Sequence, residues 1–333
     1  MEGGQALEVL KGHSSGVSAV AVLDSCQVVS GSNDRTLRVW DVGRSQAFQS
    51  FQGHSSSVDA VAVLDSRHVV SGSFDGTLRV WDAESGQARL ILQGHSLRIN
   101  AVAALDSRRM VSCSDDRTLR IWDVERGQTL QVLQGHSGWV SAVVALDVRR
   151  LVSGSGDGRL RVWDVDSGHA LRVLINRNSS SVRAVAALDS HRVVSGSEDG
   201  TLKLWDVENG QDLQVLEGHS LRVNALAVLD RRRVVSGSSD WTLRVWDVES
   251  GQTLKVLEGH SSWVGSVAVL DRRRVVSGSG DRTLRVWDVE SGEVECLFTL
   301  EAPATAVAVI PDSRVIVAGD RSGRVHFFDL VEP

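Results

Sequence analysis

The chain has 333 residues, a formal net charge of −6 and 23% charged residues, which are ordinary values for a globular protein. No apolar run approaches the ~18 residues that a membrane helix needs, and the N-terminus lacks the basic and apolar regions of a secretory signal. The slightly acidic balance argues against nonspecific binding of nucleic acid, because such binding requires a positively charged surface.

The three cysteines, Cys26, Cys113 and Cys296, have neither paired nor metal-ligand spacing. This pattern is typical of reduced, structural thiols. We therefore expect a cytoplasmic protein with no metal and no cofactor.

The predicted elements repeat along the chain. After a first apolar stretch at residues 6–10, the runs at 17–23, 28–32 and 36–41 are separated by short polar turns, and a fourth run follows in each unit. The runs are rich in Val, Leu and Thr, and the turns contain Asp, Ser and Gly, as in antiparallel β-strands. No segment shows a helical period. Each unit therefore predicts a sheet of four short antiparallel strands.

The spacing of two dipeptides defines the repeat. Gly-His pairs begin at residues 12, 53, 94, 135, 218 and 259. Trp-Asp pairs begin at residues 40, 81, 122, 163, 205, 246 and 287, and Phe328-Asp329 continues the series. A period near 41 with these dipeptides resembles the WD-repeat family of β-propellers. The resemblance covers essentially the whole chain and implies one eight-bladed propeller over residues 1–333.

The two ends of the chain indicate how the ring closes. The segment Ala6–His13 matches the last strand of a unit, whereas the C-terminal segment stops after the third strand of the eighth unit. We expect the N-terminal strand to complete the last blade, which removes an open sheet edge.

The resemblance implies a hydrogen-bonded chain of His, Ser, Asp and Trp within each blade. The matching residues are His13, Ser30, Asp34 and Trp40; His54, Ser71, Asp75 and Trp81; His95, Ser112, Asp116 and Trp122; His136, Ser153, Asp157 and Trp163; His219, Ser236, Asp240 and Trp246; and His260, Ser277, Asp281 and Trp287. The same residue types form catalytic triads, but six nucleophiles in one chain are implausible. A buried indole N–H needs a partner, so we interpret the set as structural.

Two units depart from this pattern. The fifth keeps Ser195, Asp199 and Trp205 but lacks the histidine, and its loop is one residue longer. In the eighth, Glu301, Ala318, Ser322 and Phe328 stand at the four positions, which predicts that the network is absent there.

The units vary mainly at four positions, which strand alternation places in the loops of one rim, here called the top rim. The third position after the histidine holds Gly16, Ser57, Arg98, Trp139, Ser181, Arg222, Trp263 and Ala304, and the fifth holds Ser18, Asp59, Asn100, Ser141, Arg183, Asn224, Gly265 and Ala306. Before the turn Asp come Asn33, Phe74, Asp115, Gly156, Glu198, Ser239, Gly280 and Arg321, and after it come Arg35, Gly76, Arg117, Gly158, Gly200, Trp241, Arg282 and Gly323.

Aromatic and arginine side chains are enriched in protein interfaces. The resemblance implies that partners bind on the top rim. We predict Phe74, Trp139, Trp241 and Trp263 as anchors, Arg98, Arg183 and Arg222 as contacts for acidic or phosphorylated groups, and Asn100 and Asn224 as contacts for an extended backbone. The alternative is neutral drift at surface positions of an amplified repeat.

These observations favour a noncatalytic protein-interaction module that binds a protein or peptide and neither nucleic acid nor a membrane. A repeat scaffold without a specific ligand, natural or engineered, and a receptor for phosphorylated segments remain alternatives. An enzyme is disfavoured, because no nucleophile, paired carboxylates or cofactor motif stands outside the network. The sequence names neither the partner nor the oligomeric state.

Overall fold

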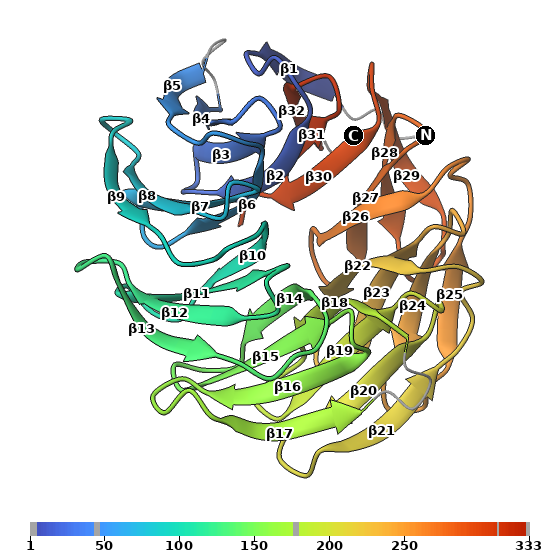
Figure 1. Cartoon of the computed structure of the whole chain (residues 1–333). Helices are drawn as coiled ribbons and strands as arrows, with labels where there is room; N and C mark the ends of the chain where they lie inside the picture. The colour runs from blue at the N-terminus through green and yellow to red at the C-terminus, as the bar shows by residue number, and fades with distance from the viewer. Residues whose placement is uncertain (1–4, 43–46, 176–179, 312, 331–333) are drawn as a thin grey trace.

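The computed structural model describes residues 5–42, 47–175, 180–311 and 313–330. These residues form eight sheets, each of four antiparallel strands, and contain no helix and therefore none able to span a membrane. The sheets stand side by side as blades around a central axis (Figure 1). The expected eight-bladed β-propeller is confirmed.

The strands occupy equivalent places in every blade. The inner strands are β2 (Val17–Val22), β6 (Val58–Val63), β10 (Ile99–Ala104), β14 (Val140–Ala145), β18 (Val182–Ala187), β22 (Val223–Val228), β26 (Val264–Val269) and β30 (Ala304–Val309). The second strands are β3 (Gln27–Ser32), β7 (His68–Ser73), β11 (Arg109–Ser114), β15 (Arg150–Ser155), β19 (Arg192–Ser197), β23 (Arg233–Ser238), β27 (Arg274–Ser279) and β31 (Val315–Asp320).

The third strands are β4 (Thr36–Asp41), β8 (Leu78–Asp82), β12 (Leu119–Asp123), β16 (Arg159–Asp164), β20 (Leu202–Asp206), β24 (Leu243–Asp247), β28 (Thr283–Asp288) and β32 (Arg324–Asp329). The outer strands are β5 (Ala47–Gln52), β9 (Ala88–Leu92), β13 (Gln128–Leu133), β17 (Ala170–Ile175), β21 (Gln211–Leu216), β25 (Thr253–Leu257), β29 (Val294–Thr299) and β1 (Gln5–Lys11). We number the blades one to eight in the order of their inner strands.

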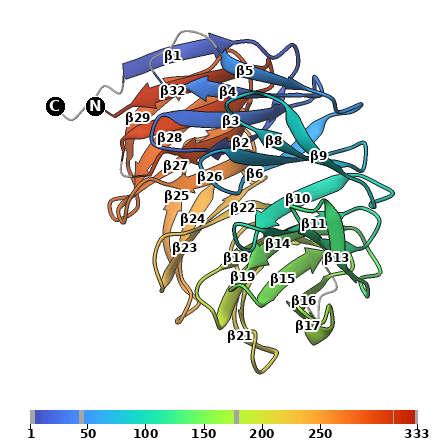
Figure 2. The ribbon, with the colours of Figure 1, turned by 90° about the vertical axis from the view of Figure 1, so that its left-hand side faces the viewer.

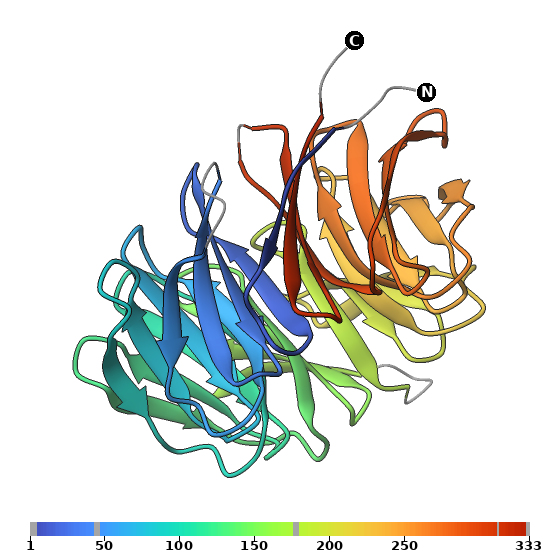
Figure 3. The same cartoon turned by 90° about the horizontal axis from the view of Figure 1, so that it is seen from above.

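The N-terminal strand completes blade eight. The order of that sheet is β1-β32-β31-β30, and β1 runs antiparallel to β32 with Gln5 opposite Asp329 and Lys11 opposite Arg324. The two strands lie side by side in Figures 2 and 3. Leu10 of β1 is buried against Phe327 of β32, in a cluster that also includes residues of blade one. The predicted closure is confirmed, and it leaves no unpaired edge on the third strand of the last blade.

The hydrophobic core lies between blades. Trp163 of blade four, for example, packs against Val111, Leu119 and Ile121 of blade three, and the equivalent tryptophans of the other blades are also buried. Because each blade buries one face against each neighbour, no blade has a core of its own. The whole ring is therefore needed to bury the apolar faces.

The register places the variable positions on one rim. Inner strands begin where second strands end, as in the pairing of Val17 with Ser32 and of Val140 with Ser155. The loops before the inner strands and the turns between second and third strands therefore lie together on the top rim. The turns at the other strand ends form the bottom rim.

Arginines on the bottom rim join neighbouring blades. Arg150 pairs with Asp147 of its own turn and with Glu208 of blade five, and its guanidinium donates a hydrogen bond to the carbonyl of Ser190. Arg109, Arg192 and Arg233 make the same type of bond to the next blade's turn. These four arginines are thus engaged in ion pairs within their own turns as well as in bonds to the next blade.

The alignment of the eighth unit needs a correction. Ala304 pairs with Asp320, as Val17 pairs with Ser32 in blade one, so the turn after β30 contains one extra residue. Leu300, rather than Glu301, therefore stands at the histidine position. The residues equivalent to Trp139 and Ser141 are Pro303 and Thr305 rather than Ala304 and Ala306.

Candidate functional site

The recurring polar residues of each complete blade form one continuous hydrogen-bonded chain. In blade one the Trp40 indole Nε1–H donates to Ser30 Oγ over 2.7 Å, and Ser30 Oγ lies 2.8 Å from His13 Nε2. The other ring nitrogen, Nδ1, lies 2.9 Å from Asp34 Oδ2. Blades two, three, four, six and seven repeat the arrangement.

A neutral imidazole satisfies this geometry. The serine Oγ accepts a hydrogen bond from the indole N–H and donates its own hydroxyl to an unprotonated Nε2, while Nδ1–H donates to the aspartate. Burial agrees with this assignment, because it lowers the pKa of His13, His54 and His260 below the ordinary value of 6.5.

The aspartates of the network stay ionised. Burial opposes ionisation, but hydrogen bonds from the neighbouring threonine or backbone amides and from the histidine outweigh it. They hold the pKa of Asp75, Asp157 and Asp281 at about 2. With every member saturated by its neighbours, the network has no free nucleophile. Its role is to fix the loop before the inner strand to the turn after the second strand.

Blades five and eight differ. In blade five the Trp205 indole still donates to Ser195 Oγ over 2.8 Å, and the predicted extra loop residue falls within residues 176–179, which lie outside the described part of the chain. In blade eight the four network positions hold Leu300, Ala318, Ser322 and Phe328, and a different set of polar residues is hydrogen-bonded nearby. Asp320 accepts hydrogen bonds from Ser322 and from the backbone of Arg324, and its carboxylate lies 2.8 Å from His326 Nε2. Because Asp320 and His326 are both buried, this is a different polar cluster with the same location.

The variable positions of the top rim are paired. The residue three after the histidine accepts a backbone hydrogen bond from the residue before the turn Asp, as Trp139 does from Gly156 and Trp263 from Gly280. In blades two, four, six and seven, a large side chain at one position stands opposite a serine or glycine at the other. The sequence showed both positions to vary, and the structure shows that they vary as neighbours.

Among the Phe and Trp side chains whose placement the structure describes, the exposed ones all lie on the top rim. Phe74, Trp139 and Trp241 are 55%, 42% and 53% exposed. Trp263 is half-buried and lies 5.3 Å from the guanidinium carbon of Arg321. Leu97 and Leu221, two residues after their histidines, are each 52% exposed on the same rim. Sequence comparison between units overlooked these leucines, although both stand where other units have Ser, Gly or Ala.

The three predicted arginine contacts already have partners within the protein. Arg98 pairs with Asp59 of blade two over 3.2 Å and stacks on Phe74. Arg183 pairs with Glu198, and Arg222 lies 3.8 Å from the same carboxylate. These guanidiniums are therefore held in place, and an incoming anion must compete with the two carboxylates.

The two predicted asparagines tie blades together. Asn100 donates from its amide nitrogen to the carbonyl of Val140 over 2.8 Å, and Asn224 does so to Val264 over 2.9 Å. Ser141 makes the equivalent bond to Val182. The residue five after the histidine therefore joins neighbouring blades at these three places.

A cavity of about 870 Å³ opens on the top rim between blades three and six. Its lining includes six of the predicted residues, namely Arg98, Asn100, Trp139, Arg183, Arg222 and Asn224. Asp115, Arg117, Ser137, Gly138 and Ser141 complete it. The structure thus gathers these six side chains around one polar hollow and leaves Phe74, Trp241 and Trp263 outside it. No cluster of potential metal ligands occurs among the described residues.

Comparisons with known proteins agree with this architecture. The family model described as WD domain, G-beta repeat matches residues 4–41, 45–82, 86–123 and 127–164, and a propeller model described as WDR41 matches residues 171–322. Among solved structures, the chain is similar to the crystal structure of the computationally designed Ika8 protein, with a TM-score of 0.90 and 37% identity over 98% of this chain and 100% of that one. The search of curated proteins gave no match.

Eight blades, six of which contain a complete Trp–Ser–His–Asp chain, define a repeat β-propeller whose loops form a variable rim. The chain belongs to the WD-repeat β-propeller family. Members of this family are typically noncatalytic scaffolds for protein interactions.

Proposed function

We propose that this protein is a noncatalytic interaction module that binds a peptide segment of a partner protein across its top rim. The observation that carries the proposal is the confinement of the exposed Phe and Trp side chains to that rim, among those whose side-chain placement the structure describes. Exposed aromatic groups lower solubility when they are idle and contribute strongly when an interface buries them.

The proposed binding surface combines two parts. Phe74, Trp139 and Trp241 are the apolar anchors, and the half-buried Trp263, which contacts Arg321, adds apolar surface on the same rim. The cavity between blades three and six takes polar or acidic groups of the segment, because Arg98, Arg183 and Arg222 line it. A phosphorylated segment is the variant of this proposal in which a phosphate displaces Glu198 or Asp59 from those arginines.

A propeller without a specific ligand is the second candidate. The similarity to the designed Ika8 protein favours it, because both chains have the same fold and this one repeats nearly identical blades. In that case the rim residues differ between blades without consequence for binding.

A random peptide library displayed on phage separates the two candidates. The test variant combines Trp139→Ala with Trp241→Gly. Glycine fits the backbone at position 241, because blades two, four, five and eight already have glycine at the equivalent position. The control variant is Val148→Ala with Arg149→Ala on the bottom rim, where Val148 is 52% exposed. We expect the native chain and the control to enrich the same peptides, and the test variant to lose them without melting earlier. Enrichment that the test variant retains would overturn the proposed surface, because binding would then not use these tryptophans, whereas no enrichment by the native chain supports the bare scaffold.

A further inference from the structure

One backbone position on the top rim is left-handed in every blade. The residue after the turn Asp has a φ between +67° and +90°. Glycine occupies it in four blades, as Gly76, Gly158, Gly200 and Gly323. The other four have Arg35, Arg117, Trp241 and Arg282, with φ of 73°, 70°, 74° and 67°.

The four side chains are costly at this position. A residue with a Cβ is sterically destabilised in the left-handed conformation, which glycine adopts freely. The turn does not need a side chain there, since half of the blades form it with glycine. Asn and Asp tolerate this conformation best among the other residues, yet the chain has three arginines and a tryptophan.

The neighbouring loop adds a second constraint. A Cβ built on Gly200 would lie 2.5 Å from the carbonyl oxygen of His219, and one on Gly323 would lie 2.6 Å from that of His13. The position thus faces the loop of the next blade, at the seam between two blades. A side chain there projects over that seam on the top rim.

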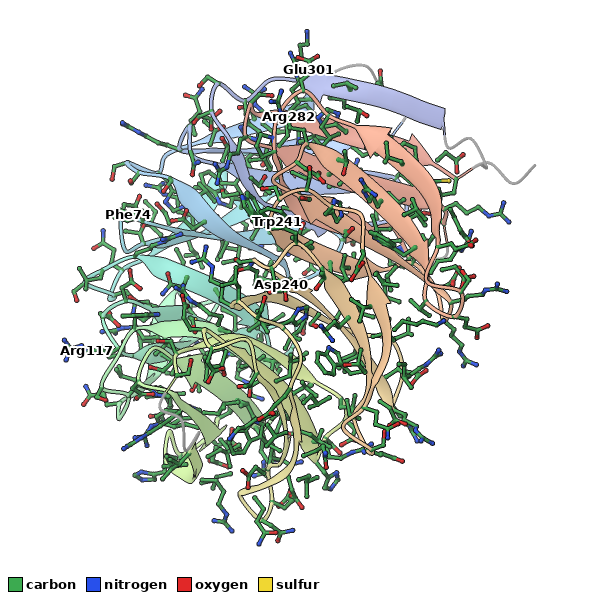
Figure 4. All side chains as sticks on the ribbon, turned by 90° about the vertical axis from the view of Figure 1, so that its right-hand side faces the viewer. Phe74, Arg117, Asp240, Trp241, Arg282 and Glu301 are labelled. Atoms are coloured by element: carbon green, nitrogen blue, oxygen red, sulfur yellow. The ribbon has the colours of Figure 1, made fainter. Side chains whose placement is uncertain are left out.

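These four side chains are exposed and have no partner of their own among the described residues. The structure shows no hydrogen bond or ion pair to the guanidiniums of Arg35, Arg117 and Arg282, and all three are exposed. Arg117 reaches the lining of the top cavity. The contrast with Arg98, Arg183 and Arg222 is clear, because those arginines have carboxylate partners. Figure 4 shows Trp241 beside Asp240, Arg282 in another loop, and Arg117 at the margin of the ribbon.

We propose, on the basis of the function proposed above, that Arg35, Arg117, Arg282 and Trp241 select an acidic protein segment. The arginines receive Asp or Glu carboxylates, which their planar guanidiniums can hold through two hydrogen bonds each. Trp241 covers an apolar side chain of the same segment. The charge of the unpaired guanidiniums identifies the partner as acidic, and their strained backbone indicates that folding alone does not account for them.

The test uses three variants of the full chain. In the first, Arg35, Arg117 and Arg282 are each changed to Gly, which removes charge and strain together. In the second, the same residues are changed to Lys, which keeps the charge. The third is a matched control on the bottom rim, with Arg149→Gln, Arg231→Gln and Arg272→Gln, which removes equal charge from the other side.

The probe is a fluorescein-labelled Glu-rich peptide with one Leu, compared with the peptide in which each Glu is replaced by Gln and with one that carries phosphoserine instead. We expect anisotropy titrations to show that the native chain binds the Glu peptide at least about tenfold more tightly than the Gln peptide, a difference of about 1.4 kcal/mol. The Gly variant loses this preference and melts at the same or a higher temperature. The Lys variant keeps part of it, and the control keeps all of it.

Several results would overturn the proposal. The Gly variant could bind the Glu peptide as well as the native chain does, or it could melt earlier, which would show that the arginines serve folding. A preference for the phosphoserine peptide alone would overturn the assignment to carboxylates. If library peptides bind and depend on Trp139 but not on the three arginines, this inference fails while the proposed function stands. If the native chain binds no peptide at all, the proposed function fails first.

Discussion

The indole ring of Trp139 lies against the backbone of Gly156, so that a Cβ on Gly156 would stand 2.4 Å from the ring. Trp263 and Gly280 repeat the arrangement, since a Cβ on Gly280 would stand 2.4 Å from the indole nitrogen. The absent side chain of each glycine leaves the space in which the tryptophan rests. Both tryptophans are therefore held in fixed orientations on the rim.

Gly156→Ala should displace Trp139 without unfolding the blade. The φ of Gly156 is accessible to alanine, so the new methyl group acts mainly by pushing the exposed ring, and the free energy of unfolding should change by less than about 1 kcal/mol. Indole fluorescence and its quenching by acrylamide should change clearly. The same substitution in a Trp139→Ala background serves as the control, and equal spectral changes in both backgrounds would contradict the predicted contact.

Ser277→Ala should lower the free energy of unfolding by more than expected for the loss of a single oxygen atom. The Trp287 indole N–H and His260 Nε2 both lose their partner on Ser277 Oγ, which costs roughly 1–3 kcal/mol for an unsatisfied buried group. Adding Trp287→Phe removes one of the orphaned groups, so the double variant should cost less than the sum of the two single variants. Blade eight is the natural precedent, with Ala318 and Phe328 at these positions. Denaturant titrations of the four chains measure the coupling, and strict additivity would refute the proposed hydrogen-bonded chain.

Acid should destabilise the protein in two stages. Because burial lowers the folded-state pKa of His13, His54 and His260, the unfolded chain binds more protons below about pH 6.5, and stability falls from there as the pH drops. Asp75, Asp157 and Asp281 have folded pKa values of about 2 against an ordinary 3.8. Their contribution is complete above about pH 4 and is lost toward pH 2. Melting temperatures at constant ionic strength test this, and a flat profile between about pH 7 and 5 would contradict the neutral imidazoles.

The closing strand provides a matched pair of substitutions. Leu10 is 2% exposed and its neighbour Val9 is 42% exposed on the same strand. Leu10→Ala should cost about 2–5 kcal/mol through the cavity that it leaves, whereas Val9→Ala should change the free energy of unfolding by about 0.5 kcal/mol or less. Thermal unfolding compares the two variants. Equal effects would mean that β1 contributes only its backbone to blade eight.

The fold could be predicted from the sequence because the same pattern of strands and turns recurs in eight units. The spacing of the Trp-Asp pairs predicted the blades, and the match of residues 6–13 to a fourth strand predicted the closure that β1 and β32 make. The network of His13, Ser30, Asp34 and Trp40 was predictable because its members recur together.

The state of the rim side chains was not predictable in the same way. Arg98 meets Asp59 across a boundary between blades, and only the closed ring defines which residues face each other there. The sequence showed that the position after the turn Asp holds Gly, Arg or Trp. Its positive φ could not be predicted, because φ there depends on the register of the second and third strands. The sequence alignment of the eighth unit was wrong by one residue before β30. Phe328 follows Trp287 at the usual spacing, so the extra residue after β30 could not be recognised from the repeat.

The joining of β1 to β32 also fixes how the ring responds to mechanical load. Gln5 and Asp329 are opposite each other at one end of this antiparallel pair. A pull applied through the two ends of the strands therefore acts across the ladder and peels its hydrogen bonds one after another, instead of shearing them all at once. The ring is closed by the pairing of β1 with β32 in blade eight, and tension would open the ring at this pair of strands.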